Sequence, residues 1–247
     1  MRGNNAYALE DTYDGEPLSA ANSPAMARAA FIKRTYAHVF GAVLAFVALE
    51  TVLFKTGIAD EILRTVFGGG GGKFAWIALM VAFVGAGYVA QIMAQAASKP
   101  LQYAGLGLYI AVEAVIFLPI LWKAGQMTGQ PVVAQAGLMT LLVFGGLTTF
   151  VFVSGKDFSF MGPMLAVLSF AALGLVIASV FLGFSLGLVF SVAMVVLAAG
   201  MIVYDTSNVM RNYGTDQHVG AALSLFASLA TMFFYILRIV MATSNRD

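Results

Sequence analysis

The chain has 247 residues, of which 60% are hydrophobic and only 10% are charged, and its formal net charge is +1. Soluble domains average about 45 to 50% apolar and about 25% charged residues, so this composition excludes an ordinary soluble domain and favours a membrane protein. A nearly neutral chain with two His residues and no Cys gives no support for nucleic-acid binding, disulfides, a thiol nucleophile or a transition-metal site.

Residues 1–30 form a polar, acidic segment that contains Pro17 and Pro24. Such a segment buries too little apolar surface to order itself, so we expect a disordered N-terminal tail. It lacks the basic start and immediate apolar core of a signal peptide, so the first apolar run is expected to remain as a membrane span. The predicted transmembrane domain covers residues 31–243.

Apolar runs of about 20 residues fill most of the remaining chain, and each is long enough to cross about 30 Å of hydrocarbon as a helix. Residues 163–208 are nearly continuous, but one helix of that length would measure about 69 Å, so a turn near Gly183 must divide it. The sequence therefore predicts an all-α membrane protein with seven transmembrane helices. The predicted spans are residues 36–54, 74–97, 101–122, 132–153, 163–182, 185–208 and 219–241.

The loops between these spans carry unequal numbers of Lys and Arg. When alternate loops are taken together, the side of the N-terminus has seven and the other side has five. Cytoplasmic loops of membrane proteins are richer in Lys and Arg, so the count favours an N-terminus inside and a C-terminus outside.

The last span contains a regular polar stripe. Ser224, Ser228, Thr231, Tyr235 and Arg238 recur at intervals of 4, 3, 4 and 3, which places them on one face of a helix. The opposite side is apolar, so the stripe is expected to face other helices or a wet cavity. Two interpretations remain open, namely hydrogen-bonded helix packing and the lining of a permeation pathway.

Asp205, in the sixth predicted span, is the first candidate for a functional acid. It precedes the turn at residues 214–216 by about as much as Ser228 follows it, so an antiparallel hairpin would bring the two side chains level. Desolvation disfavours a charged carboxyl, whereas Arg238 or hydroxyl donors favour it, so protonation of Asp205 could act as a gate. The alternative is that Asp205 only ties down a helix end near the headgroups.

Two further acids lie within predicted spans. Glu113, in the third span, either lines the pathway and pairs with Arg238 or is a structural counter-ion without a role in transport. Glu50, near the end of the first span, is expected to reach interfacial water. The predicted lining of the pathway is therefore Glu113, Ser224, Thr231 and Tyr235.

Catalysis is not expected. The glycines at 183 and 187 flank Ser185 in the GxSxG pattern of hydrolases, but no strand precedes them and neither His38 nor His218 lies in a span near that turn. In the absence of a nucleophile or an acid–base constellation, we expect no enzymatic activity and no cofactor.

Several stretches of the sequence form recognisable motifs. They are Tyr-Asp-Thr at 204–206, Ala-Ala-Leu-Ser-Leu-Phe at 221–226 and Tyr-Ile-Leu-Arg at 235–238, preceded by residues 102–106, 117–120 and 155–162. In this order, over residues 31–240, they resemble the Bax inhibitor-1 (transmembrane Bax inhibitor motif) family, in particular its bacterial members. The resemblance implies a bundle with a central C-terminal helix, in a bacterial cytoplasmic (inner) membrane.

The resemblance also implies a pH-sensitive calcium leak through the bundle, controlled by a pair of aspartates on spans six and seven. Asp205 matches the first aspartate, but Ser228 stands at the position of the second, and Arg238 matches the basic residue of span seven. Two carboxyls that share a proton strongly change each other's titration, and a hydroxyl removes that effect. Gating in the family's usual pH range is therefore not implied for this chain.

The first functional hypothesis is a calcium or cation leak in which Asp205, Ser228 and Arg238 form the pH sensor and gate. Calcium takes about 6 to 8 oxygen ligands, so Asp205 alone is expected to bind it weakly and transiently. The alternative is a non-conducting regulator that binds other membrane proteins or a membrane protease, as the family's cell-death and quality-control associations suggest. The expected partners are the lipid bilayer, cations and such proteins.

Overall fold

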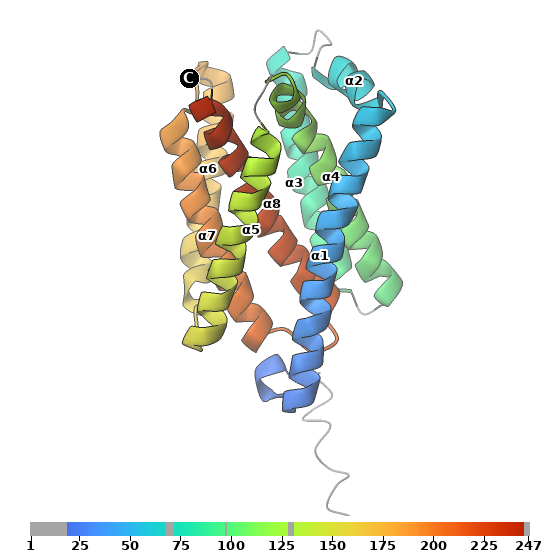
Figure 1. Ribbon diagram of the computed structural model, residues 1–247, viewed down its shortest axis with the longest axis vertical. Coiled ribbons are helices and arrows are strands. Elements are labelled where there is room, and N and C mark those ends of the chain that lie inside the picture. Colours follow the sequence, from blue (N-terminus) through green and yellow to red (C-terminus); the bar gives the residue numbers. More distant parts are fainter. Residues whose placement is uncertain (1–18, 68–71, 97, 128–130, 245–247) are drawn as a thin grey trace, which may run out of the picture.

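A bundle of long helices makes up most of the computed structural model, which describes residues 19–67, 72–96, 98–127 and 131–244 (Figure 1). The long helices are α1 (Ala25–Lys55), α3 (Gly72–Ala94), α4 (Lys99–Gly125), α5 (Val132–Ser154), α6 (Gly162–Leu182), α7 (Leu188–Arg211) and α8 (His218–Ser244). The short elements are η1 (Ala20–Asn22), α2 (Ile58–Ile62), the π-helical turn η2 (Leu63–Phe67) and η3 (Ser159–Met161).

Six of the described helices are long and apolar enough to cross a membrane, namely α1, α4, α5, α6, α7 and α8. The prediction of an all-helical membrane protein is therefore confirmed. The remaining predicted span, residues 74–97, corresponds to α3, whose apolar part within the described residues, Met80–Ala94, is shorter than a full crossing. The count of seven spans thus depends on α3.

Two of the helix ends are set by glycine. Gly155 after α5 and Gly183 after α6 have φ angles of 58° and 73°, in the left-handed region that ends helices and that residues with a Cβ adopt at a cost. The turn predicted near Gly183 is confirmed, because α6 ends at Leu182 and α7 begins at Leu188.

The helical part of the chain begins earlier than the boundary predicted at residue 30. Helix α1 starts at Ala25, directly after Pro24, and Ala20 is fully buried in a cluster with Phe31, Val39 and neighbouring residues of α7 and α8. Residues 1–18 of the predicted tail lie outside the described residues. The run Ala25–Ala30 explains the difference, since Ala is the strongest helix former and four of the six residues in this run are Ala.

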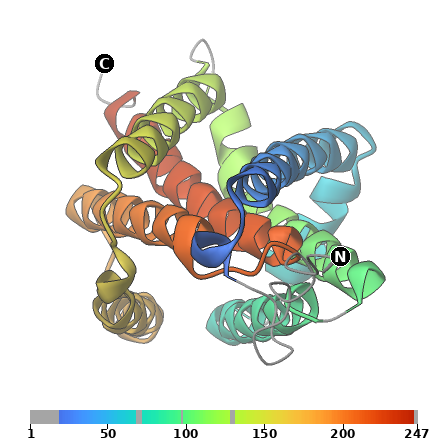
Figure 2. The same cartoon turned by 90° about the horizontal axis from the view of Figure 1, so that it is seen from below.

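Helix α8 lies at the centre of the bundle, as the family resemblance implied (Figure 2). It packs against α1, α3, α4, α5 and α7, and 56% of its apolar window is buried, compared with 39% or less for the other five candidate spans. Helix α6 lies at the periphery beside α7. Both faces of α8 are therefore covered, and the apolar side opposite the polar stripe, including Leu225 and Met232, is buried in protein.

Helices α3 and α4 are in backbone contact at Gly105. A Cβ on Gly105 would lie 2.6 Å from the Ala90 carbonyl oxygen and 2.8 Å from the Ala94 nitrogen, whereas a Cβ on Gly107 would meet nothing within 4 Å. We expect Gly105→Ala to lower the free energy of unfolding by about 1–3 kcal/mol, because the backbones would have to separate. Reversible unfolding in detergent measures this, and an equal effect of the matched change Gly107→Ala would contradict it.

Candidate functional site

Asp205 and Ser228 meet between α7 and α8. The antiparallel hairpin that joins these helices turns at residues 212–217, and the Ser228 hydroxyl donates to Asp205 Oδ2 over 2.5 Å. Ser228 is buried and Asp205 is partly buried. The prediction that the hairpin brings these two side chains level is confirmed.

Three tyrosines interact electrostatically with Asp205. Tyr36 of α1, Tyr109 of α4 and Tyr213 of the α7–α8 turn all lie within electrostatic range of Asp205. The Tyr213 hydroxyl is 3.0 Å from the Ser224 hydroxyl. Burial raises the pKa of Tyr213 to about 12, so its hydroxyl keeps its proton at neutral pH. The Ser224 hydroxyl therefore contacts a neutral phenol, at the end of the polar stripe nearest the α7–α8 turn.

The loop that carries the motif at 155–162 docks beside Asp205. The Phe158 backbone N–H donates to the Ser207 hydroxyl over 2.9 Å, and the Ser159 hydroxyl donates to the Asn208 side chain over 3.3 Å. A Cβ on Gly162 would lie 2.9 Å from the ring of Tyr204. Two of the stretches that suggested the family thus touch in space, and they fix the stretch of α7 that holds Asp205.

A cavity of about 590 Å³ begins one helical turn from the pair. Two of its lining residues lie one turn from the pair, about 5 Å along each helix: Met201 precedes Asp205 on α7, and Thr231 follows Ser228 on α8. Its remaining lining comes mainly from α3, α4, α6, α7 and α8, with mostly apolar side chains. The polar side chains that line it are Glu113, Ser169, Ser179, Ser185, Thr231, Tyr235 and Arg238.

Three of the four predicted lining residues therefore share one cavity. Glu113 is buried in α4, with Tyr109 one turn away on the same helix and close to its carboxyl. Thr231 donates to the Ala227 carbonyl of its own helix over 2.9 Å, and Tyr235 packs edge-on against Phe190. Ser224 does not belong to this set, because it lies beyond Ser228 towards the α7–α8 turn.

Arg238 lies at the other end of the cavity from the Asp205–Ser228 pair. Its Nη2 donates to the Leu186 carbonyl over 2.8 Å, in the turn between α6 and α7, and its guanidinium lies 5.8 Å from the centre of the Tyr235 ring. Ten residues of helix separate Arg238 from Ser228, about 15 Å, which an Arg side chain does not span. The structure therefore places Arg238 with Glu113 in the cavity and not beside Asp205.

The prediction that Glu50 reaches water is wrong, because its side chain is only 6% exposed and is buried among residues of α1, α4 and α8. Tyr213 was not among the predicted site residues, although its position in the turn close to Asp205 was a usable signal. Among the described residues, no group of three or more His, Cys, Asp and Glu lies close enough together to hold a metal ion.

Comparison with known proteins gives the family. The family model described as "Inhibitor of apoptosis-promoting Bax1" matches residues 28–246, most of the chain. The chain belongs to the Bax inhibitor-1 family. The resemblance seen in the sequence motifs is thereby confirmed, and the Asp205–Ser228 contact is a feature of a Bax inhibitor-1 family member.

Relatives in this family come from plants and bacteria. The protein LIFEGUARD 4 of Arabidopsis thaliana is 28% identical over 223 residues, which are 86% of this chain and 84% of the relative. A BI1-like protein of Arabidopsis thaliana is 35% identical over 48% of each chain, and an uncharacterised protein of Pseudomonas aeruginosa is 34% identical over 47% of this chain and 52% of its own length. No solved structure matches the chain significantly.

Proposed function

We propose that this protein is a pH-sensitive cation leak, with calcium as its candidate ion and the Asp205–Ser228 contact as its gate. The observation that carries the proposal is the position of this contact. The hydrogen bond joins α7 to α8 one turn beyond the 590 Å³ cavity, and in this proposal breaking it extends the cavity towards the α7–α8 turn. Ionisable residues inside a membrane bundle commonly mark such pathways.

Two charged side chains in the cavity support control of cation passage at the end away from Asp205. Glu113 and Arg238 line the same space, so one attracts and the other repels a cation that enters it. Asp205 supplies one carboxylate, and the Ser228 hydroxyl lies within hydrogen-bonding distance of it. Because calcium takes about 6 to 8 oxygens, this set favours weak, transient binding completed by water.

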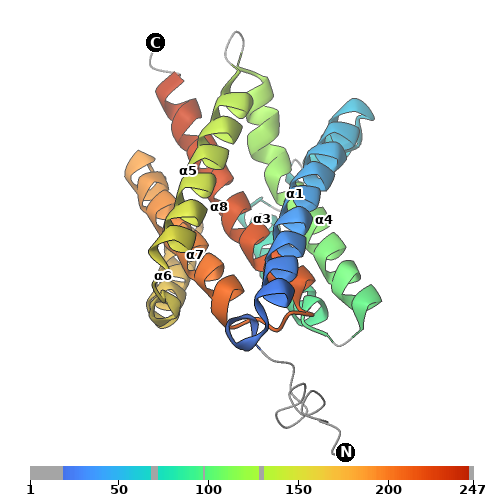
Figure 3. The same cartoon turned by 60° about the horizontal axis from the view of Figure 1, so that its bottom comes forward.

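The position of the N-terminal segment supports seven spans. Ser19 and Gly214 pair as an antiparallel bridge, and the Ala20 N–H donates to the Tyr213 carbonyl over 2.8 Å. Figures 1 and 3 show the start of α1 beside the α7–α8 turn. Two points on the same side of a membrane are separated by an even number of crossings, and α1, α4, α5, α6 and α7 supply an even number only together with α3. We therefore include α3 as a span.

The orientation and the membrane belong to the same proposal. With seven spans the excess of Lys and Arg lies on the side of the N-terminus, which favours an N-terminus inside. Bacterial proteins are among the relatives, so we propose the bacterial cytoplasmic (inner) membrane. The gate then lies towards the cytoplasmic side and the Arg238 end of the cavity towards the outside.

Calcium flux in proteoliposomes tests the function. We expect the purified protein to admit calcium above the rate of empty vesicles, and Asp205→Asn to change that rate by about tenfold or more, because it removes the one charge at the gate. The matched control is Asp60→Asn, on the exposed surface of α2, which should leave the rate unchanged. Equal rates for wild type and empty vesicles would reject the leak, and equal rates for wild type and Asp205→Asn would reject the gate.

A second candidate function is a non-conducting regulator that binds other membrane proteins or a membrane protease. The family description, which names an inhibitor of a Bax protein, favours it. The flux assay separates the two candidates, since a regulator would show no flux at any pH. Neither candidate function involves catalysis or a bound cofactor, and we propose none.

A further inference from the structure

A second cavity lies on the opposite side of α8 from the proposed pathway. It has a volume of about 420 Å³ and is bounded by the last turns of α1 and α4, with Val133 of α5 and Phe233 of α8 at its base. This volume falls within the range of about 300–1,000 Å³ that is typical of small-molecule sites. It shares no lining residue with the cavity that holds Glu113 and Arg238.

Glu50 lines this second cavity and has no partner. Its side chain is 6% exposed, and neither carboxylate oxygen has a hydrogen bond among the described residues. A buried carboxylate without a partner is costly, and protein structures normally pair or hydrogen-bond such groups. The cavity beside it thus lacks a group that would compensate Glu50.

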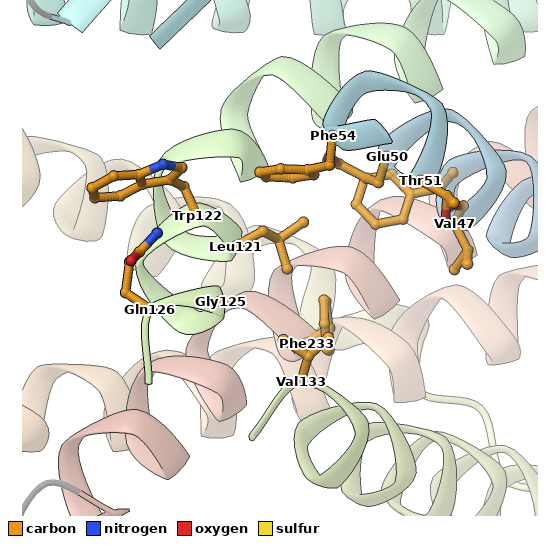
Figure 4. A pocket seen from close by; sticks show the side chains of 11 residues that line it. Val47, Glu50, Thr51, Phe54, Leu121, Trp122, Gly125, Gln126, Val133 and Phe233 are labelled. Atoms are coloured by element: carbon orange, nitrogen blue, oxygen red, sulfur yellow. The ribbon is translucent and has the colours of Figure 1, made fainter. Parts of the chain in front are cut away.

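Four aromatic residues line the same cavity as Glu50. Phe46 and Phe54 lie one turn before and one turn after Glu50 on α1, Trp122 projects from α4, and Phe233 projects from α8 (Figure 4). The faces of aromatic rings attract cations, and cages of such rings recognise ammonium groups. A carboxylate among aromatic rings therefore has the chemistry of a site for an organic cation.

The other polar groups of the cavity argue against a metal ion. Thr51 donates its hydroxyl to the Val47 carbonyl of its own helix over 2.7 Å, which leaves Gln126 as the remaining lining side chain, besides Glu50, with an oxygen that could bind a metal ion. Hard cations require several oxygen ligands, whereas an ammonium group needs one counter-ion and an apolar surround. The site also lies near a membrane surface, since Glu50 is five residues from the end of α1, about 8 Å, and Trp122 is half exposed at the rim.

We propose that this cavity binds an organic ammonium cation. Both Glu50 oxygens are covered in this structure, so the Glu50 side chain rotates towards the cavity to meet the nitrogen, and the apolar substituents lie against the rings of Phe54 and Trp122. Either a soluble amine or the ammonium headgroup of a membrane lipid presents this chemistry. The site is separate from the proposed pathway, so it stands whether or not the protein conducts ions.

The fluorescence emission of Trp122 measures the binding. The chain has two Trp residues, so in a Trp76→Phe background the emission comes from the cavity rim alone. In nanodiscs of phosphatidylglycerol, tetrabutylammonium chloride should change this emission saturably, and Glu50→Gln should raise the Kd at least about tenfold. The matched change Glu61→Gln, on the exposed surface of α2, should leave the Kd unchanged. Absence of a saturable response, or a Kd for Glu50→Gln within about twofold of the parent, would overturn the proposal.

Two further arms keep the test decisive if Glu50→Gln fails to fold. Neutral tributylphosphine oxide, which has a similar size, should bind the unchanged cavity at least about tenfold more weakly than tetrabutylammonium, and Phe54→Leu should weaken tetrabutylammonium binding several-fold. Equal binding of the neutral probe would overturn charge recognition. Adding phosphatidylethanolamine to the discs distinguishes the sources: competition assigns the site to a lipid headgroup, and an unchanged Kd assigns it to a soluble amine.

Discussion

Replacing Ser228 with Asp is expected to make calcium flux depend steeply on pH, changing by more than about tenfold across the titration of the new carboxyl pair. The reason is the 2.5 Å contact between the Ser228 hydroxyl and Asp205. A carboxyl placed there meets Asp205 at hydrogen-bonding distance, and two carboxyls so close share a proton. Loss of that proton leaves two negative charges that repel each other, which should separate α7 from α8.

The measurement is calcium entry into proteoliposomes over a series of external and internal pH values. Ser228→Ala is the first control, because it removes the hydrogen bond and adds no charge. Thr243→Asp is the second, because it adds a carboxyl to α8 at an exposed position near the end of the helix. Identical pH profiles for Ser228→Asp and Ser228→Ala would contradict a gate at this contact.

The parts of the site that the sequence predicted follow from local geometry. The Asp205–Ser228 contact needs only two helices of known period and a short turn between them, so counting residues from 214–216 was enough. The division at Gly183 likewise follows from the length of a helix that crosses a bilayer and from a residue that tolerates positive φ. Neither inference required knowledge of the packing of distant helices.

The parts that the sequence did not predict depend on tertiary packing. The partner of Arg238 is the backbone carbonyl of Leu186, which any residue would offer, so no pattern in the sequence marks it. Burial of Glu50 depends on α4 and α8, which are far away in the chain. The apolar side of α8 is covered by protein and not by lipid, and the two environments are equally apolar, so periodicity cannot separate them.

Replacing Arg238 with Gln is expected to raise cation flux by about tenfold or more. Arg238 lines the cavity of Glu113 at the end away from the Asp205–Ser228 pair. A positive charge about 8 Å from a permeating unit charge costs about 2 kcal/mol at an effective dielectric constant of about 20, so its removal favours cation entry. Glu113 then remains as the charged residue of the cavity lining.

Two further variants separate charge from packing. Arg238→Lys keeps the charge and should keep flux near the wild-type rate, although the Leu186 carbonyl loses its guanidinium donor. Tyr235→Phe keeps the ring that faces Arg238 and removes only the hydroxyl, so it should also leave flux unchanged. If Arg238→Gln and Arg238→Lys raise the flux equally, the effect comes from loss of the contact with the α6–α7 turn. An effect of Arg238→Gln alone identifies the positive charge as the barrier to cations.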